Sequence, residues 1–261
     1  MKPLRLLSLL LCMVAASSWA YAMRISSPAD FTRVDSLVKQ VSIAPGIRQI
    51  PPYAFAECRQ LTTLTFEAGS RCVSIGEGAF YRCEKLTDAQ LPQSVTDIGR
   101  YAFAWCQSLA KASFPGAVKI RAHAFAYCIS LDSAELPSRL KSVGNNAFSR
   151  CESLTEIAVP SSVTELESYA FSDCLKLRRA TLPANPSLLG ELIFSGCASL
   201  EEIVEPSPEV PPFDCNSFIF EPDDTAAYRR CRLLVSPLAL HKYTEAPGWK
   251  LFRRIEKFSY E

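Results

Sequence analysis

Cysteine is the residue type with the widest chemistry in this sequence, because a thiol can form a disulfide, bind zinc or act as a nucleophile. The chain has 11 cysteines in 261 residues. Seven of them recur every 22 to 25 residues, each three residues after a phenylalanine (one position after Ile193, otherwise after alanine) in the pattern A-F-x-x-C-x-x-L. These seven are Cys58, Cys83, Cys106, Cys128, Cys151, Cys174 and Cys197. Their chemistry therefore depends on how a repeat of this length folds.

A fixed period in the twenties predicts a solenoid, in which each repeat forms one coil. The repeat that begins at Leu154 reads L-T-E-I-A-V-P-S-S-V-T-E-L-E-S-Y-A-F-S-D-C. The alternation of Ile157 and Val159 predicts a short strand, and Pro160 ends it because proline lacks a backbone donor. Phenylalanine, cysteine and leucine then recur every three residues, which predicts a short helical or 3-10 return with one face inward. A second extended segment should connect the proline turn to this return.

The solenoid decides between the possible roles of the cysteines. Equivalent positions on stacked coils lie about 4.7 to 4.9 Å apart, within the Cα range of a disulfide, but their Cβ bonds run parallel rather than toward each other. We therefore expect reduced, buried thiols that pack as small hydrophobic groups. Ligands in a straight row cannot converge into a zinc tetrahedron. We expect neither a metal nor a cofactor.

General acid–base catalysis has few candidates in this sequence. There are two histidines, and no nucleophile elbow, phosphate loop or metal motif. One exposed strand column reads Thr63, Asp88, Lys111, Ser133, Glu156, Arg179 and Glu202. Acids and bases alternate there, and opposite charges on adjacent strands contribute about 0.2 to 1 kcal/mol per pair, which is a sufficient structural explanation. We expect the protein not to be an enzyme.

A binding surface is better supported. The column two residues after each phenylalanine reads Glu57, Arg82, Trp105, Tyr127, Arg150, Asp173 and Gly196. Two arginines flank two neighbouring aromatic residues, and such side chains are enriched at interface hot spots. Tyr101 and His123, two residues before a phenylalanine on the same coils, should lie nearby, with His123 solvated. The candidate site is Arg82, Tyr101, Trp105, His123, Tyr127 and Arg150. The competing interpretation, which we favour, is that these side chains only pack against one another along the solenoid.

The ends of the chain differ from the repeat. Residues 1–22 resemble a secretory signal, with two basic residues, an apolar stretch from Leu6 to Ala16 and an A-x-A cleavage site at residues 20–22. We expect an N-terminal cap at 23–37, a solenoid of about eight coils at 38–230, and a C-terminal cap at 231–261. The last coil is degenerate and ends around Val210, Phe213 and Phe218. The C-terminal cap should contain a strand at 231–235, a helix at 238–245 and apolar cover from Trp249, Phe252 and Ile255.

Charge and hydropathy exclude two classes of partner. Removal of residues 1–22 leaves 26 basic and 27 acidic residues, a net charge of −1. This balance gives no basic footprint for nucleic acid. No other apolar run is long enough to span a membrane, so we expect an exported chain without an integral membrane segment after cleavage.

The repeated unit L-x-x-I-x-V-P-x-x-V-x-x-I-x-x-x-A-F-x-x-C resembles the BspA-like (treponemal-type) leucine-rich repeat family over roughly residues 37 to 258. The tail C-R-L-L-V-S-P-L-A-L-H-K-Y-T-E-A-P-G-W-K-L-F resembles the closing segment of such proteins. This resemblance implies a right-handed curved solenoid with a parallel strand face. It also implies a secreted or cell-surface protein, several relatives of which bind host extracellular proteins, although no binding residue can be transferred.

We therefore predict a non-catalytic binding module for a protein partner, located at the cell surface, outside the cell or in the periplasm. Two alternatives remain open. Exposed Trp and Tyr rings could stack on the sugars of a glycan, and the chain could also be a structural envelope component without a discrete ligand.

Overall fold

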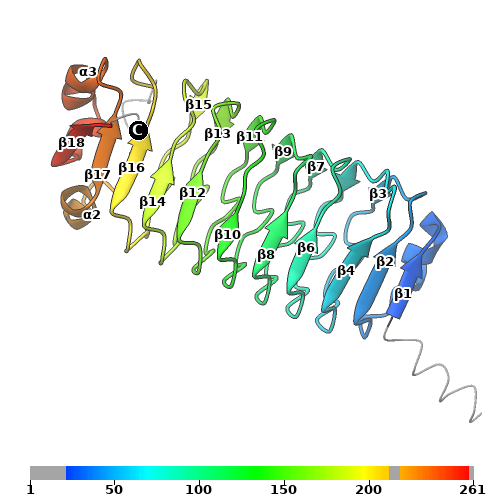
Figure 1. Ribbon diagram of the computed structural model, residues 1–261. Coiled ribbons are helices and arrows are strands. Elements are labelled where there is room, and N and C mark those ends of the chain that lie inside the picture. The colour runs from blue at the N-terminus through cyan, green and yellow to red at the C-terminus, as the bar shows by residue number, and fades with distance from the viewer. Residues whose placement is uncertain (1–21, 212–217, 259–261) are drawn as a thin grey trace, which may run out of the picture.

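The computed structural model describes residues 22–211 and 218–258. The chain winds into an elongated solenoid with a parallel sheet along one side (Figure 1). In the N-terminal half this sheet has the order β1-β2-β4-β6-β8-β10. The strands are β1 (Ala22–Ile25), β2 (Gln40–Ile43), β4 (Thr63–Phe66), β6 (Asp88–Gln90), β8 (Lys111–Ser113) and β10 (Ser133–Ala134). The C-terminal half continues with β12 (Glu156–Ala158), β14 (Arg179–Thr181), β16 (Glu202–Glu205), β17 (Arg232–Val235) and β18 (Arg254–Lys257).

A second parallel sheet is formed by strands of two residues each, in the order β15-β13-β11-β9-β7-β5-β3. They are β3 (Gln49–Ile50), β5 (Ser74–Ile75), β7 (Asp97–Ile98), β9 (Lys119–Ile120), β11 (Ser142–Val143), β13 (Glu165–Leu166) and β15 (Leu188–Leu189). In every one of these strands the second residue is buried. The predicted repeat solenoid with a parallel strand face is confirmed.

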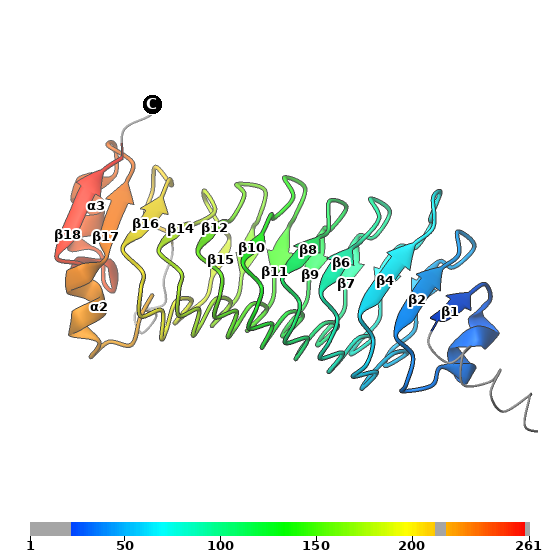
Figure 2. The ribbon, with the colours of Figure 1, turned by 60° about the horizontal axis from the view of Figure 1, so that its bottom comes forward.

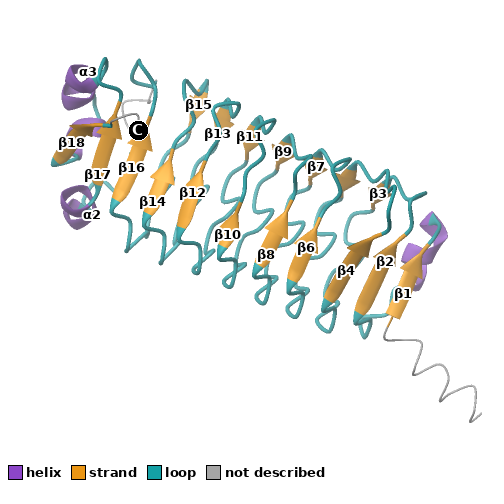
Figure 3. Cartoon of the chain, in the orientation of Figure 1, coloured by secondary structure: helices purple, strands orange, loops and turns teal. Residues whose placement is uncertain are grey.

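Helices occur at the two ends of the solenoid (Figure 3). The N-terminal end has β1 and the 3-10 helix η1 (Pro28–Arg33), and the C-terminal end has α2 (Thr225–Arg230), α3 (Leu240–Glu245) and the 3-10 helix η2 (Trp249–Leu251). The view in Figure 2 shows these elements closing the two ends of the stack. The expected signal segment, Phe213 and the end of the C-terminal segment lie outside the described residues, except that Ala22 begins β1. Strand β18 was not predicted from the sequence.

The core is a single stack of phenylalanine rings. Successive rings of Phe55, Phe80, Phe103, Phe125, Phe148, Phe171 and Phe194 are stacked with centroids 5.0 to 5.9 Å apart. All seven side chains are fully buried. At the N-terminal end, Phe31 of η1 meets Phe55 edge-to-face at 5.8 Å. The repeat thus buries one ring per coil, and η1 covers the first one.

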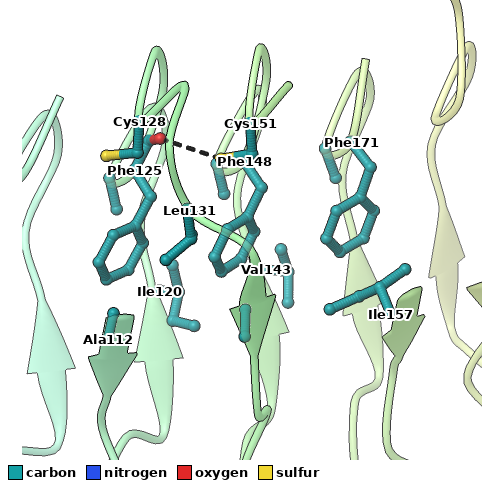
Figure 4. Packing of buried hydrophobic residues seen from close by; sticks show 14 of the residues in the cluster. Ala112, Ile120, Phe125, Cys128, Leu131, Val143, Phe148, Cys151, Ile157 and Phe171 are labelled. Atoms are coloured by element: carbon teal, nitrogen blue, oxygen red, sulfur yellow. Dashed lines mark hydrogen bonds between the residues drawn. The ribbon is translucent and has the colours of Figure 1, made fainter. Parts of the chain in front are cut away.

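The thiols lie beside this stack and point along it. Cys151 Sγ donates a hydrogen bond to the carbonyl oxygen of Phe125 in the preceding coil, at 3.4 Å (Figure 4). The same contact, at 3.1 to 3.3 Å, joins Cys83, Cys106, Cys128, Cys174 and Cys197 to the phenylalanine one coil earlier. The nine cysteines in the described part of the chain are free and buried, which confirms the expectation of reduced thiols. They act as donors as well as small apolar groups.

The returns between coils correct one detail of the sequence prediction. They are successive turns rather than helices (Figure 3). In the coil of Trp105, every second backbone N–H donates to the next coil: Tyr101 to Ala122 at 3.1 Å, Phe103 to Ala124 at 2.8 Å and Trp105 to Ala126 at 2.8 Å. A helix would direct these donors along its own axis. The period of three residues fits both arrangements, and contacts between coils select the turns.

Candidate interaction surface

Two columns of residues flank the buried phenylalanines, and both have unusual backbone geometry. The residues two before and two after each phenylalanine, from Tyr53 to Gly196, all have φ between 53° and 72°. Residues other than glycine rarely adopt this left-handed conformation. Here it turns the N–H of each such residue toward the next coil, as in the bond from Tyr127 to the Ser149 carbonyl at 2.8 Å. Phe125 between them is buried, whereas His123 and Tyr127 remain half-buried at the surface.

The column after the phenylalanines forms a continuous row of contacting side chains. The rings of Trp105 and Tyr127 stack at 3.9 Å with an interplanar angle of 8°. The guanidinium of Arg82 lies over Trp105 at 5.6 Å, and that of Arg150 lies over Tyr127 at 5.3 Å. At the two ends, Arg82 faces Glu57 at 4.0 Å and Arg150 faces Asp173 at 3.5 Å. We call the row Glu57, Arg82, Trp105, Tyr127, Arg150 and Asp173 the aromatic ladder.

The aromatic ladder holds its own side chains in place. Cation–π contacts at exposed sites contribute about 0.5 to 1 kcal/mol each, and surface ion pairs about 0 to 1 kcal/mol. The packing interpretation from the sequence therefore describes real contacts. The ladder nevertheless remains accessible, since the side chains of Arg82 and Arg150 are 36% and 45% exposed. Prearranged side chains lose little conformational entropy on binding.

Tyr101 and His123 form a second, shorter stack on the same two coils as Trp105 and Tyr127. Their rings stack at 4.7 Å, and Arg100 lies over Tyr101 at 5.8 Å. His123 is half-buried rather than solvated, which corrects the expectation from the sequence. Burial, followed by the positive charge of Arg100, lowers the pKa of His123. The imidazole is therefore neutral at neutral pH.

The structure places the six sequence-predicted residues on four successive coils. Arg82, Trp105, Tyr127 and Arg150 contact one another in series, and Tyr101 and His123 contact each other. Of these residues, Arg82 also lies over the ring of Tyr81 at 5.7 Å. The predicted surface is thus made of two parallel stacks.

The alternating charges on the strand face are structural. The register places Arg179 between Glu156 and Glu202. Glu202 pairs with Arg179 at 2.8 Å and with Arg232 at 2.5 Å, and its side chain is only 8% exposed. Neighbouring acids in this column are separated by a base, so the column brings no two carboxylates together as a general acid–base dyad.

A polar hollow beside the second sheet was missed by the sequence reasoning. It has a volume of about 300 Å³. Its lining is Arg100, Lys119, Ile120, Arg121, Ala122, Ser142, Gly144, Glu165 and Glu167. The signal that could have revealed it is a column that follows each short strand and reads Gly76, Gly99, Arg121, Gly144, Glu167 and Gly190. Two long charged side chains flank a glycine there, and the missing side chain of Gly144 leaves the space.

Two further searches concern only the described residues. Within residues 22–211 and 218–258, no helix is long and apolar enough to cross a membrane. The same residues contain no group of three or more His, Cys, Asp or Glu side chains arranged to hold a metal ion.

The parallel coils, the buried leucine columns and the phenylalanine stack define a leucine-rich repeat protein. The family model of the BspA type leucine rich repeat region matches residues 29–120 and 118–218, in six copies. The chain belongs to this family. Repeat proteins of this kind are generally interaction modules and typically have no catalytic activity.

Several solved structures are similar to this chain. A leucine rich repeat protein of T. pallidum (TpLRR) is 31% identical with a TM-score of 0.51, and the match covers 66% of this chain and 78% of that one. The pneumococcal vaccine antigen PcpA is 16% identical with a TM-score of 0.48, covering 92% and 71%. A leucine-rich repeat protein from Bacteroides ovatus is 21% identical with a TM-score of 0.43, covering 92% and 67%. No curated protein matches the chain.

Proposed function

We propose that this protein is an exported, non-catalytic leucine-rich repeat module that binds a protein partner through the aromatic ladder. The observation that supports it most is the stack of Trp105 on Tyr127 between Arg82 and Arg150. Aromatic and arginine side chains in a fixed arrangement are those most often found at the centre of protein interfaces. The BspA-type family and the signal-like N-terminal segment support the export of the chain.

The same stack favours a protein over a glycan. A sugar that stacks on an aromatic residue needs a free ring face. Trp105 lies between Arg82 and Tyr127, and Tyr127 lies between Trp105 and Arg150, so neighbouring coils cover both faces of each ring. What remains accessible are ring edges and guanidinium N–H groups. These donate to carboxylates and backbone carbonyls, which proteins supply.

The test compares wild type with a Trp105→Ala, Tyr127→Ala double variant. Both proteins are applied to a panel of immobilised extracellular-matrix proteins and to a glycan array. We expect wild type to bind a protein on the panel and the double variant to lose at least tenfold in affinity for it. A control variant, Glu156→Ala on the strand face, should bind like wild type.

The fold must be shown to survive the double substitution. Both rings are half-buried rather than part of the core, so the circular dichroism spectrum and cooperative unfolding should be preserved. Unchanged affinity in the double variant would rule out the aromatic ladder as the binding site. Binding to glycans alone, lost in the same variant, would replace the protein partner with a carbohydrate. Hydrolysis of any substrate would contradict the non-catalytic function.

A further inference from the structure

The polar hollow has two walls of opposite charge. The basic wall consists of Lys119 and Arg121 with Arg100 beside them, and the acidic wall consists of Glu165 and Glu167. In the second sheet, Lys119 pairs in register with Ser142, which pairs with Glu165. The two walls are therefore two strand spacings apart, about 9 to 10 Å. This is too far for the walls to form ion pairs with each other.

Contacts outside the hollow fix one residue of each wall. Arg121 forms two hydrogen bonds with Asp97 in the preceding coil, at 2.8 and 2.7 Å. Glu167 accepts the backbone N–H of Asn145 at 2.8 Å. The floor is also fixed, because a Cβ on Gly144 would lie 2.5 Å from the backbone nitrogen of Ala122. The hollow is therefore a built feature of the coils.

The other residue of each wall has its charge available. Both Lys119 and Glu165 are exposed. Among the residues that the structure describes, neither forms an ion pair. An occupant with opposite charges at this spacing would satisfy both, whereas a phosphate or another polyanion would be repelled by the acidic wall.

The hollow is continuous with the candidate interaction surface. Arg100 lines the hollow and also lies over the ring of Tyr101. Tyr101 in turn stacks on His123, which lies on the coil that supplies the basic wall. One partner that covers the two aromatic stacks can therefore reach the hollow.

We propose that the hollow receives an opposite-charge pair of side chains from the protein partner, with an acidic group on Lys119 and a basic group on Glu165. This inference rests on the proposed function, because it names the chemistry of the segment that the partner presents. Complementary charges of this kind contribute mainly to specificity and association rate.

The test uses a phage library of random 12-residue peptides as the probe, selected against four proteins. These are wild type, Lys119→Glu, Glu165→Lys and the double variant with both substitutions. We expect wild type to enrich peptides that contain both an acidic and a basic residue. The Lys119→Glu variant should lose the enrichment in acidic residues, and the Glu165→Lys variant the enrichment in basic residues. The double variant reverses both walls and should again enrich peptides with both charges.

A matched control exists on the other sheet. Lys111 and Glu156 are likewise separated by one serine, Ser133, in the outward column of the first sheet, and their reversal should leave the selected peptides unchanged. If the hollow variants select the same peptides as wild type, or if no peptide depends on Lys119 and Glu165, the proposal is wrong. The Trp105, Tyr127 double variant separates the two proposals. If it alone loses the matrix protein while the hollow variants do not, the proposed function stands and this inference fails.

Discussion

The thiol of Cys151 donates a hydrogen bond to the carbonyl oxygen of Phe125, although the two residues are 26 positions apart in the chain. The carbonyl also accepts the backbone N–H of Cys128, within its own coil, at 3.2 Å. The phenylalanine and the cysteine of the repeat are thus linked twice, once within a coil and once between coils.

This contact predicts how Cys151 responds to substitution. Cys151→Ala removes the sulfur and leaves a small void, and we expect it to lower the free energy of unfolding by about 1 to 2 kcal/mol. Cys151→Ser keeps a donor for the Phe125 carbonyl, so its loss should be no larger. Urea denaturation of both variants measures this. A serine variant that is less stable than the alanine variant by more than about 1 kcal/mol would show that the thiol acts only as an apolar group.

The buried thiols should be unreactive in the folded protein. Burial raises the pKa of Cys58 and of Cys72 to about 11. Only about a thousandth of such a thiol is ionised at pH 8, and the thiolate is the reactive form. We expect iodoacetamide to label none of the nine described cysteines at pH 8 without denaturant and all of them in urea, as read by mass spectrometry. Rapid native labelling of any of the nine would contradict their burial.

The phenylalanine stack should be more sensitive in its middle than at its end. Phe125 stacks on rings on both sides, at 5.3 and 5.2 Å, and is fully buried. Phe125→Ala should therefore cost about 3 to 5 kcal/mol, a large part of the stability of an ordinary domain. Phe31 is half-buried and meets only Phe55 in the stack, so Phe31→Ala should cost clearly less. Thermal unfolding of the two variants compares them, and an unchanged melting temperature for Phe125→Ala would place that ring outside the core.

The C-terminal end should become less stable as the pH rises. Glu205 is fully buried and accepts hydrogen bonds from Ser207 Oγ at 2.5 Å and from the hydroxyl of Tyr243 in α3. Burial raises the pKa of Glu205 to about 8. Its carboxyl group is ionised above pH 4.5 in the unfolded chain but keeps its proton up to about pH 8 in the folded one. Folding therefore takes up a proton between these values, and the stability it contributes falls across this window.

The measurement is thermal unfolding at several pH values between 5 and 8.5, for wild type and Glu205→Gln. Glutamine is nearly isosteric and cannot ionise, so the variant should show a weaker decline in melting temperature. Trp249 is buried beside Tyr243, with rings 5.3 Å apart, and its fluorescence reports on this end of the solenoid. Equal pH dependence in the two proteins would mean that Glu205 does not titrate as described.

The returns can be tested at Glu57, which has φ of 60° and a side chain that is 52% exposed. Glycine adopts this conformation without strain, whereas a β-branched residue does not. We expect Glu57→Gly to change the free energy of unfolding by less than about 1 kcal/mol and Glu57→Val to lower it by about 1 to 3 kcal/mol. Denaturant unfolding distinguishes the two. Equal stabilities would mean that this return does not impose a left-handed residue.

The sequence was informative about the core because every coil solves the same packing problem. Residues such as Phe148 and Leu154 recur at a fixed spacing, and each is fully buried. The returns were harder to predict. Their period of three residues indicates which side chains face inward, but it does not distinguish a helix from turns that hydrogen-bond to the next coil.

The outward columns show the same division. The sequence placed Trp105 next to Tyr127, since residues at equivalent positions of successive coils must be neighbours. It could not show that Arg82 and Arg150 cover the outer faces of these rings. Nor could it show that the absence of a side chain at Gly144 leaves a hollow between two charged walls. These features depend on the orientation of side chains relative to each other.

By itself, the sequence determined the solenoid, its inward columns and the reduced state of the described cysteines, because a regular repeat can bury its apolar residues only by stacking equivalent positions. The tertiary structure alone decided the left-handed returns, the contacts of the aromatic ladder, the polar hollow and the raised pKa of Glu205. Each of these depends on the distance and solvent exposure of groups on different coils or at the end of the stack, and residue spacing does not encode these quantities.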